Sequence, residues 1–318
     1  MKKDIVRAFL AILLFSISTH AKTLYVASHS GSKLFAFNIN GSQLEYLNTC
    51  EFDRKGMGPT DIDIDHEARV IFICNERTNV FNLINSRTLD DLGTIQAVGL
   101  LDGTGIAYDA VRSRLYATER DQGIMHVYDW DADTLTLTPT AFSPVILANI
   151  DYACDPVIVG NKLYVSKFLY SRINIPNRTQ YKEVFEYNID NNFAYVATHD
   201  MGISNDNTDN DVVSIAYSDY GNANNLYGVA YKDSSKIIKY DIDTPTNSTY
   251  RYIESKLVSA VADSDTGLLY TTNVTGYAFS IEVWDASDWL ITPNTPTNLL
   301  ASISPMTVAM PTEYLLAD

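Results

Sequence analysis

The sequence predicts an all-β fold, a six-bladed β-propeller whose blades are four-stranded antiparallel sheets. Three observations carry this prediction: a Leu-Tyr pair recurs six times, two further strand-like segments accompany it, and turn-forming residues separate the segments. Short strands repeated in units of roughly 40–50 residues are typical of propellers. A β-sandwich also contains short strands, but it does not explain six copies of one pattern.

The recurring pair lies at the start of the second strand of each predicted blade. Leu or Ile is followed by Tyr or Phe and then by small or β-branched residues, a pattern typical of short half-buried strands. The six segments are TLYVAS (from Thr23), VIFICN (from Val70), RLYATE (from Arg114), KLYVSK (from Lys162), NLYGVA (from Asn225) and LLYTTN (from Leu268). The spacings between the first members of the pairs, Leu24, Ile71, Leu115, Leu163, Leu226 and Leu269, are 47, 44, 48, 63 and 43 residues.

A third-strand segment follows each pair, and a first-strand segment precedes all but the first. The third-strand segments read KLFAFNI, NVFNLIN, MHVYDWD, VFEYNID, IIKYDID and IEVWDAS. The first-strand segments read DIDIDHEA, GIAYDAVR, PVIVGN, SIAYSDYGN and SAVADSDT. Asp, Asn, Gly, Ser and Pro between the segments suit tight turns, and we expect the carboxylates there to cap those turns.

The ends of the chain predict how the ring closes. The chain reaches a second strand first, at Leu24, and a sixth first-strand segment, TVAMP, occurs at Thr307–Pro311. We therefore expect a C-terminal inner strand, Thr307–Met310, to pair with the N-terminal strands, which would leave only short protected edges. The strand-like tail Tyr314–Ala317 has no predicted position.

The segment GMGPTDIDIDHEARVIFICNERTNVFNLIN, from Gly56 to Asn85, gives the order of strands within a blade. A G-x-x-P element leads an inner strand, a turn follows, and the second and third strands come next. This order resembles the YVTN-type β-propeller repeat family, and the resemblance extends over nearly all of the chain after residue 21 as a scaffold. YVTN-type propellers usually have seven blades. In its six predicted blades the chain is similar to the gluconolactonase and strictosidine-synthase-like propellers.

Residues 1–21 have the layout of a secretory signal peptide, so the propeller is predicted to be a single domain over residues 22–318. The segment starts with Lys2, Lys3 and Arg7, continues with an apolar run from Ala8 to Ile17, and ends in small and polar residues. That run is much shorter than the roughly 20 residues of a membrane-spanning helix. We expect cleavage after Ala21 and a secreted or periplasmic protein.

The charge of the chain indicates which partners it avoids. The formal net charge is −16; without residues 1–21, which hold three basic residues and one acidic residue, 20 basic and 38 acidic side chains give −18. So acidic a surface repels nucleic acid and anionic membranes and favours solubility or cation binding. We expect no nucleic-acid partner, no membrane insertion and a monomer.

Three cysteines, Cys50, Cys74 and Cys154, follow the signal peptide. An odd number leaves at least one thiol unpaired in a monomeric exported protein. A chain of this size can bury a sufficient core without disulfides. We expect the three to be packing residues, with one disulfide bridge as the alternative.

Two long insertions predict which rim of the propeller is functional. FLYSRINIPNRTQYKE (Phe168–Glu183) follows a second strand, and MGISNDNTDND (Met201–Asp211) leads into the next blade, so both fall on one rim. Long loops in compact folds are usually functional or mobile. We therefore predict a binding or scaffold module that holds a protein, peptide, glycan or small molecule on this rim. Neutral variation in loop length is the alternative.

The same rim collects varied polar side chains. Tyr and Arg are favoured at binding hot spots, and the first insertion offers Tyr170, Arg172, Arg178 and Tyr181. Candidate ligand-binding residues at the ends of second strands are His29, Glu76, Arg77, Glu119, Arg120, Lys167 and Lys232. Each alone is equally consistent with an exposed charge at a strand end.

A metal-dependent lactone or ester hydrolase is the alternative function. The resemblance to gluconolactonase-type propellers implies a divalent cation, Ca²⁺ or Mg²⁺, held by oxygen ligands at the channel mouth. Asp61, Asp102 and Asp155 are the candidate metal ligands. The corresponding segments GPTD, DGTG, CDP and SKLVS lack the Glu and Asn of that family. The sequence therefore leaves open whether the protein catalyses a reaction.

Overall fold

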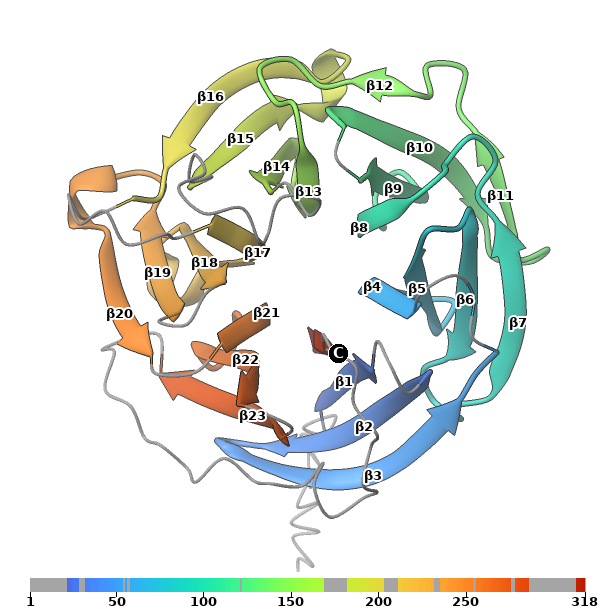
Figure 1. The fold of residues 1–318 in the computed structure, drawn as a ribbon, viewed down its shortest axis with the longest axis horizontal. Coiled ribbons are helices and arrows are strands. Elements are labelled where there is room, and N and C mark those ends of the chain that lie inside the picture. Colours follow the sequence, from blue (N-terminus) through green and yellow to red (C-terminus); the bar gives the residue numbers. More distant parts are fainter. Residues whose placement is uncertain are drawn as a thin grey trace, which may run out of the picture.

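The structure, a computed structural model, describes residues 22–28, 32–53, 55, 58–120, 122–168, 182–202, 211–231, 235–253, 256–275, 278–285 and 313–317. These residues form six antiparallel sheets that surround a central axis as the blades of a β-propeller (Figure 1). The predicted fold is therefore confirmed. Within the described ranges, no helix is long and apolar enough to cross a membrane.

Blades 1 to 3 contain the first half of the chain. Blade 1 consists of β1 (Lys22–Ser28), β2 (Lys33–Asn40), β3 (Gln43–Glu51) and β24 (Glu313–Ala317). Blade 2 consists of β4 (Gly58–Asp65), β5 (Val70–Glu76), β6 (Val80–Asn85) and β7 (Asp91–Gln96). Blade 3 consists of β8 (Gly103–Asp109), β9 (Arg114–Glu119), β10 (Ile124–Asp131) and β11 (Thr136–Pro139), and the short β12 (Val145–Ile146) also pairs with β10.

Blades 4 to 6 follow the same order. Blade 4 consists of β13 (Ala153–Val159), β14 (Lys162–Lys167), β15 (Glu183–Asn188) and β16 (Ala194–Asp200). Blade 5 consists of β17 (Asp211–Ser218), β18 (Asn225–Tyr231), β19 (Ser235–Asp241) and β20 (Thr249–Ile253). Blade 6 has three described strands, β21 (Lys256–Asp263), β22 (Leu268–Thr275) and β23 (Ala278–Asp285), and the segment expected to supply its fourth strand lies outside the described residues.

The ring closes through the C-terminal strand β24, which pairs antiparallel with β1 from Leu24↔Ala317 to Ser28↔Glu313. Closure by a C-terminal inner strand is as predicted, but the segment is different. The expected strand Thr307–Met310 lies outside the described residues, and Tyr314–Ala317, which had no predicted position, belongs to the closing strand. Both segments are short and apolar, so strand pattern alone did not distinguish them.

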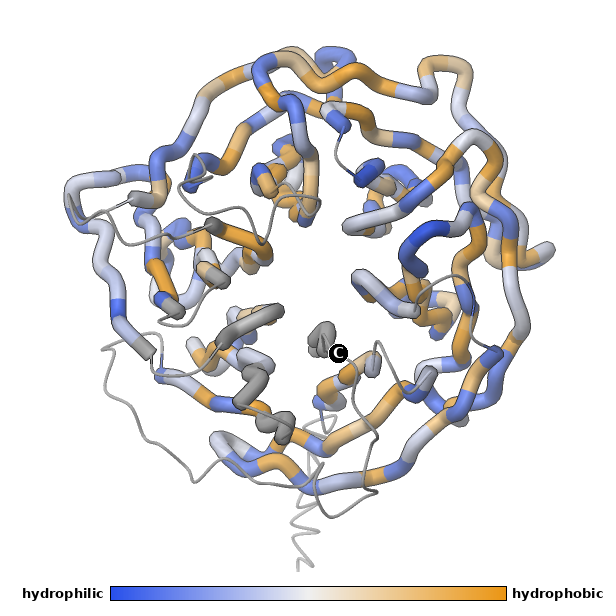
Figure 2. Tube along the Cα trace, in the orientation of Figure 1, coloured by the Kyte–Doolittle hydropathy of each residue, from blue (hydrophilic) through white to orange (hydrophobic). Residues whose placement is uncertain are grey.

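The Leu-Tyr pairs hold neighbouring blades together. Successive side chains of a strand point to opposite faces, so the first residue of each pair packs toward one neighbouring blade and the second toward the other. In the hydrophobic clusters between blades, Tyr25 packs with Ile71, Phe72 with Leu115, Tyr116 with Leu163, Tyr164 with Leu226, Tyr227 with Leu269, and Tyr270 with Leu24. All of these side chains are buried. In Figure 2, hydrophobic residues lie mainly within the strands and hydrophilic ones are frequent at the turns.

Aspartates at the ends of inner strands cap the following turns, as predicted. Asp65 Oδ1 accepts hydrogen bonds from the backbone N–H groups of Glu67 and Ala68, both at 3.0 Å. Asp109 Oδ1 accepts from Val111 at 3.0 Å and Arg112 at 3.2 Å. Each such bond satisfies a backbone donor that the turn would otherwise leave unpaired.

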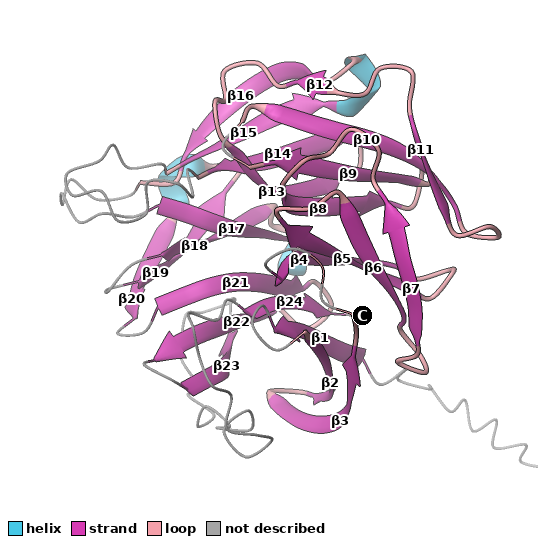
Figure 3. Ribbon diagram, turned by 45° about the vertical axis from the view of Figure 1, so that its right-hand side comes forward, coloured by secondary structure: helices cyan, strands magenta, loops and turns pink. Residues whose placement is uncertain are grey.

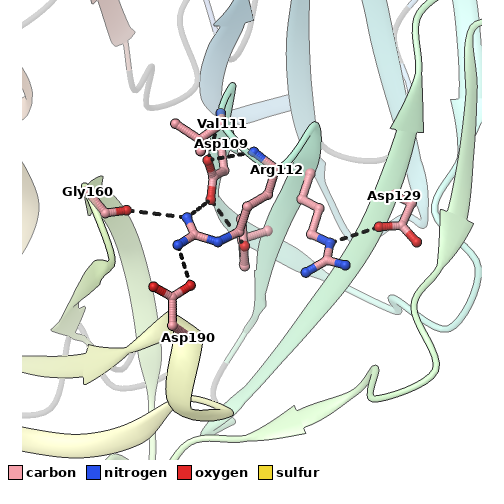
Figure 4. Close-up of polar contacts among 8 residues, drawn as sticks. Asp109, Val111, Arg112, Asp129, Gly160 and Asp190 are labelled. Atoms are coloured by element: carbon pink, nitrogen blue, oxygen red, sulfur yellow. Dashed lines mark hydrogen bonds and ion pairs between the residues drawn. The ribbon is translucent and has the colours of Figure 1, made fainter.

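One of these turns also joins blades 3 and 4. The Arg112 guanidinium lies between Asp109 and Asp190, with Nη1–Oδ2 and Nη2–Oδ1 distances of 2.6 and 2.5 Å, and Nη1 also donates to the Gly160 carbonyl at 3.3 Å (Figure 4). The two carboxylates raise the pKa of Arg112 above its ordinary value. The contact ties the first turn of blade 3 to two turns of blade 4 on the same rim.

All three cysteines are buried free thiols, which agrees with their expected packing role. Burial raises the pKa of Cys50 to about 11, and the pKa of Cys74 also lies above its ordinary value because that thiol is buried. A thiol with a raised pKa is a poor nucleophile at neutral pH. These cysteines therefore serve the packing of the blades.

Candidate functional site

Strand register places most of the predicted site residues on one rim. The inner strand of each blade begins where its second strand ends, as the pairs Gly58↔Glu76, Gly103↔Glu119 and Ala153↔Lys167 show. We call this end of the ring the loop rim, and the opposite end, where the first-to-second and third-to-fourth strand turns lie, the turn rim (Figure 3). His29, Tyr170, Arg172, Arg178, Tyr181 and Lys232 lie outside the described residues.

Four of the candidate residues meet in a polar network on the loop rim of blades 2 and 3. Arg120 Nη1 lies 2.6 Å from Glu76 Oε1, and Arg120 Nε lies 3.4 Å from Asp102 Oδ2. Asp102 Oδ1 also accepts the backbone N–H of Arg77 at 2.6 Å. The network joins the end of β5 to the residues just before β8 and just after β9. Asp102, predicted as a metal ligand, is instead a member of this network.

Glu119 lies inside blade 3 and does not face a ligand on the rim. Its Oε2 atom is 2.8 Å from Nε2 of His126 on β10, and both side chains are buried. Blade 4 repeats the arrangement with Glu186 and His199 at 2.9 Å. Buried polar groups in proteins are normally paired in this way. No spacing in the sequence signals either of these Glu–His pairs.

Lys167, at the end of β14, lies close to the start of the first insertion. Its Nζ atom is 3.5 Å from Asp151 Oδ2 and 5.9 Å from the centre of the Phe185 ring. A cation over an aromatic face gains a favourable electrostatic contact. The lysine therefore has a defined position on the loop rim of blade 4.

Both insertions leave the ring at one place on the loop rim. Lys182, near the end of the first insertion, accepts the backbone N–H of Met201 at 3.0 Å through its carbonyl. Its Nζ atom lies 3.3 Å from Asp200 Oδ1, just before the second insertion. Phe168, the first residue of the first insertion, packs in a buried cluster with Cys154 and Val213. The described ends of both segments are thus fixed to each other and to the inner strands.

Asp61, Asp63 and Asp155 face the central channel, where a cavity of about 300 Å³ is bounded by the inner strands of blades 2 to 6. All three accept a backbone N–H from the inner strand of the next blade. Asp61 Oδ2 accepts that of Ile106 at 2.8 Å and Asp63 Oδ2 that of Tyr108 at 2.5 Å. Asp155 Oδ2 accepts that of Ile215 at 2.7 Å. We call this contact the inter-blade latch.

In blade 5 a serine forms the inter-blade latch, and between blades 3 and 4 the latch is absent. Ser214 Oγ, at the register position of Asp61, accepts the backbone N–H of Ala260 at 3.2 Å. In blade 3 the same position is Gly105, which has no side chain, and the residue facing it in blade 4 is Pro156, which has no N–H. Donor and acceptor are therefore absent together, and no backbone polar group is left unpaired.

The glycine in blade 3 is also required by close packing. A Cβ atom on Gly105 would lie 2.4 Å from the carbonyl oxygen of Cys154 and 2.5 Å from Cδ of Pro156. Such distances are far below van der Waals contact. The aligned sequence positions Asp61, Gly105, Asp155 and Ser214 contained this pattern, but only the strand register reveals it.

The channel carboxyls have raised pKa values because the surrounding protein disfavours their charged forms. Burial and the negative charge of Asp63 raise the pKa of Asp155 to about 7. Burial raises the pKa of Asp63 to about 6, and burial together with the charge of Asp155 holds the pKa of Asp61 well above its ordinary value. All three side chains still reach the channel.

These pKa values predict how stability depends on pH. A carboxyl with a pKa near 4 when unfolded and about 7 when folded binds more protons in the folded state. The stabilisation that this carboxyl adds to the folded state is complete below about pH 4. It is lost as the pH rises through about 7. Asp155→Asn keeps an acceptor for Ile215 without a buried charge, so we expect its free energy of unfolding to fall less than that of wild type between about pH 5 and about pH 8.

Urea unfolding of both proteins at the two pH values measures this difference. Asp131→Asn is the matched control, because Asp131 is an exposed turn aspartate whose pKa is lowered by the turn's hydrogen bonds. We expect the free energy of unfolding of Asp131→Asn to fall as much as that of wild type between the two pH values. Equal pH dependence of wild type and Asp155→Asn would contradict the assignment of a raised pKa to this carboxyl.

The predicted metal ligands do not form one site. Asp61 and Asp155 line the channel, whereas Asp102 belongs to the rim network. Among the described residues, no group of three or more His, Cys, Asp or Glu side chains could hold a metal ion. The hydrogen bonds of Asp61 and Asp155 connect neighbouring blades.

Comparison with known proteins supports the fold. No family model matches the sequence, and no curated protein sequence matches it. A chain of a nidogen/laminin complex is similar in structure, with a TM-score of 0.60 and 11% identity over 92% of this chain and 98% of that chain. Hydrazine synthase from Kuenenia stuttgartiensis matches with a TM-score of 0.50 and 14% identity over 71% of this chain, which spans 61% of that chain.

These similarities are of fold alone. The chain is a six-bladed β-propeller. Membership of the YVTN-type family is not confirmed, since no family model matches. A propeller supports a binding or scaffold function in general, because its rigid blades hold the loops on each rim in fixed positions.

Proposed function

We propose that this protein is an exported binding module that holds a protein, peptide or glycan on the loop rim of blades 4 and 5. The observation that carries the proposal is the joining of the two insertion sites at Lys182. The backbone of this residue accepts the N–H of Met201, and its side chain pairs with Asp200. Two long segments that start from one rigid base can present a single continuous surface.

The base beneath the insertions is well suited to this task. Phe168, Cys154 and Val213 bury their side chains where the inner strands of blades 4 and 5 begin. Lys167 is held beside them by Asp151 and the Phe185 ring. A rigid base lowers the entropic cost of binding, because fewer groups must be ordered when the partner arrives.

A replacement variant tests the proposal. Residues 170–181 are exchanged for a short Gly-Ser linker, which retains Phe168 and Lys182. Partners of the wild-type protein are found by glycan array and by cross-linking among exported proteins, and their affinities for both proteins are measured. We expect each partner to be lost or to bind at least about tenfold more weakly.

The control carries the same linker inserted at Gly41, an exposed turn-rim position where no other atom lies within 4 Å of an added Cβ. It should bind like wild type. Unchanged affinity of the replacement variant for every partner would remove the proposal.

Export is the second part of the proposal and rests on the layout of residues 1–21. We expect the mature protein to start at Lys22. The intact mass of protein recovered from the periplasm or medium measures this directly. An exported protein that still carries residues 1–21 would contradict it.

A further inference from the structure

A cleft of about 610 Å³ opens between blades 1 and 2, apart from the loop rim and the channel. One wall is formed by β1, β2 and β3. The other wall is formed by the turn between β4 and β5 and by the turn between β6 and β7. Both turns belong to the turn rim, so the cleft lies on the side of the ring opposite the insertions.

The charge of the cleft contrasts with the rest of the molecule. Arg69, Arg87 and His66 line it, and none of the described residues that line it is Asp or Glu. The whole chain has 39 acidic and 23 basic residues. In the part of the chain that the structure describes, neither guanidinium has a hydrogen-bonding or ion-pair partner. Two such guanidinium groups in one concave site concentrate positive potential there.

The backbone of the cleft is strained at two positions. Arg69 has φ = 58° and Leu89 has φ = 61°. The turn of blade 6 that corresponds to the Arg69 turn has Gly267 at this position, with φ = 71°. Glycine adopts this conformation at little cost, whereas other residues are disfavoured there by roughly 1 kcal/mol. The equivalent turn of blade 3 has Ser113 with φ = 50°, so the conformation belongs to this type of turn. At this position Arg69 supplies a charge to the cleft.

The remaining walls offer both polar and apolar contacts. Tyr25 and Ser86 form a fixed part of the lining, since the Tyr25 hydroxyl donates to the Ser86 carbonyl at 2.7 Å. Asn48 and Thr88 add polar side chains, and Leu47, 52% exposed, adds an apolar one. Pockets that combine apolar walls with a few polar groups are typical of small-molecule sites.

We propose that this cleft binds a small hydroxylated organic anion, with its carboxylate or phosphate held by Arg69 and Arg87. Guanidinium groups match the planar geometry of carboxylate and the oxygens of phosphate with paired hydrogen bonds. Asn48 is placed to bond a hydroxyl group, and Leu47 to contact the carbon skeleton. The site does not depend on the loop-rim proposal, because it shares no residue with it.

Titration calorimetry of the mature protein tests the proposal with three probes of similar ring structure: glucuronate, glucose 6-phosphate and neutral glucose. We expect saturable binding of at least one anion and none of glucose. Preference for glucuronate or for glucose 6-phosphate distinguishes a carboxylate ligand from a phosphate ligand. Absence of saturable binding of both anions, or equal binding of glucose, would overturn the proposal.

Two variants locate the site. Arg69→Gly removes the charge and places glycine where the backbone favours it, so the fold should be retained while anion affinity falls about tenfold or more. Arg87→Gln should act in the same direction. Arg114→Gln is the control, since it removes an equal charge from the turn rim of blade 3, where Arg114 pairs with Asp129 at 2.8 Å. Affinity that is equal in Arg69→Gly and Arg114→Gln would also overturn the proposal.

Discussion

Gly105→Ala is expected to lower the free energy of unfolding by about 3 kcal/mol, the upper end of the range for overpacking. The added Cβ would lie 2.4 Å from the Cys154 carbonyl oxygen and 2.5 Å from Pro156 Cδ. Both atoms belong to the inner strand of blade 4, and neither is the end of a flexible side chain. Blades 3 and 4 would have to move apart, and a closed ring can accommodate this only by shifting its other interfaces. Urea unfolding measures the loss.

Gly41→Ala is the matched control for this prediction. Gly41 has φ = 59°, and an added Cβ there meets no atom within 4 Å. Only backbone strain opposes the alanine, so we expect a loss of about 1 kcal/mol. Equal losses in the free energy of unfolding for Gly105→Ala and Gly41→Ala would contradict this prediction. Close approach of blades 3 and 4 could then not be the reason for glycine at position 105.

Phe72→Ala is expected to destabilise the protein by about 3–5 kcal/mol, as is usual for the loss of a buried aromatic side chain. Phe72 is fully buried between blades 2 and 3. Its ring meets Trp130 edge-on at a centroid distance of 4.8 Å and lies 5.7 Å from the Tyr108 ring. The cavity would open at a blade interface, where flat sheets cannot collapse into it easily. The free energy of unfolding, measured in urea, reports the effect.

Phe142→Ala provides a control of the same side-chain size. Phe142 is 43% exposed and contacts Phe193 and Arg114 at centroid distances of 5.9 and 5.3 Å. We expect a loss of no more than about 1.5 kcal/mol, because little buried surface is removed. If Phe142→Ala lowered the free energy of unfolding as much as Phe72→Ala, burial between two blades would not determine how much stability is lost.

The fold could be predicted because its main packing contacts repeat along the sequence. Leu24–Tyr25 and its five equivalents place one large side chain on each face of a second strand, and every blade interface requires one of each. Periodicity alone therefore revealed both the number of blades and the order of strands. The turn-capping role of Asp65 and Asp109 was predictable for a similar reason, because the short loops after inner strands share one local geometry.

The candidate site was less predictable because its contacts join different blades. Asp61, Asp102 and Asp155 all precede or begin inner strands, yet Asp102 lies on the rim and the other two bond the next blade. The inner strands contain irregular register near these positions, for example between Pro59 and Asp61. A shift of one residue changes which side chain faces the neighbouring blade. Sequence spacing did not contain this information.

The closing strand β24 has a consequence for biosynthesis. It comes after every other described strand of the chain, and β1 has no inner neighbour until β24 pairs with it. During translation, blade 1 therefore waits as an incomplete sheet with an open edge while blades 2 to 5 form, and such edges invite pairing with other chains. Chaperones that shield β1 until the C-terminal segment emerges would act at the most vulnerable stage of maturation.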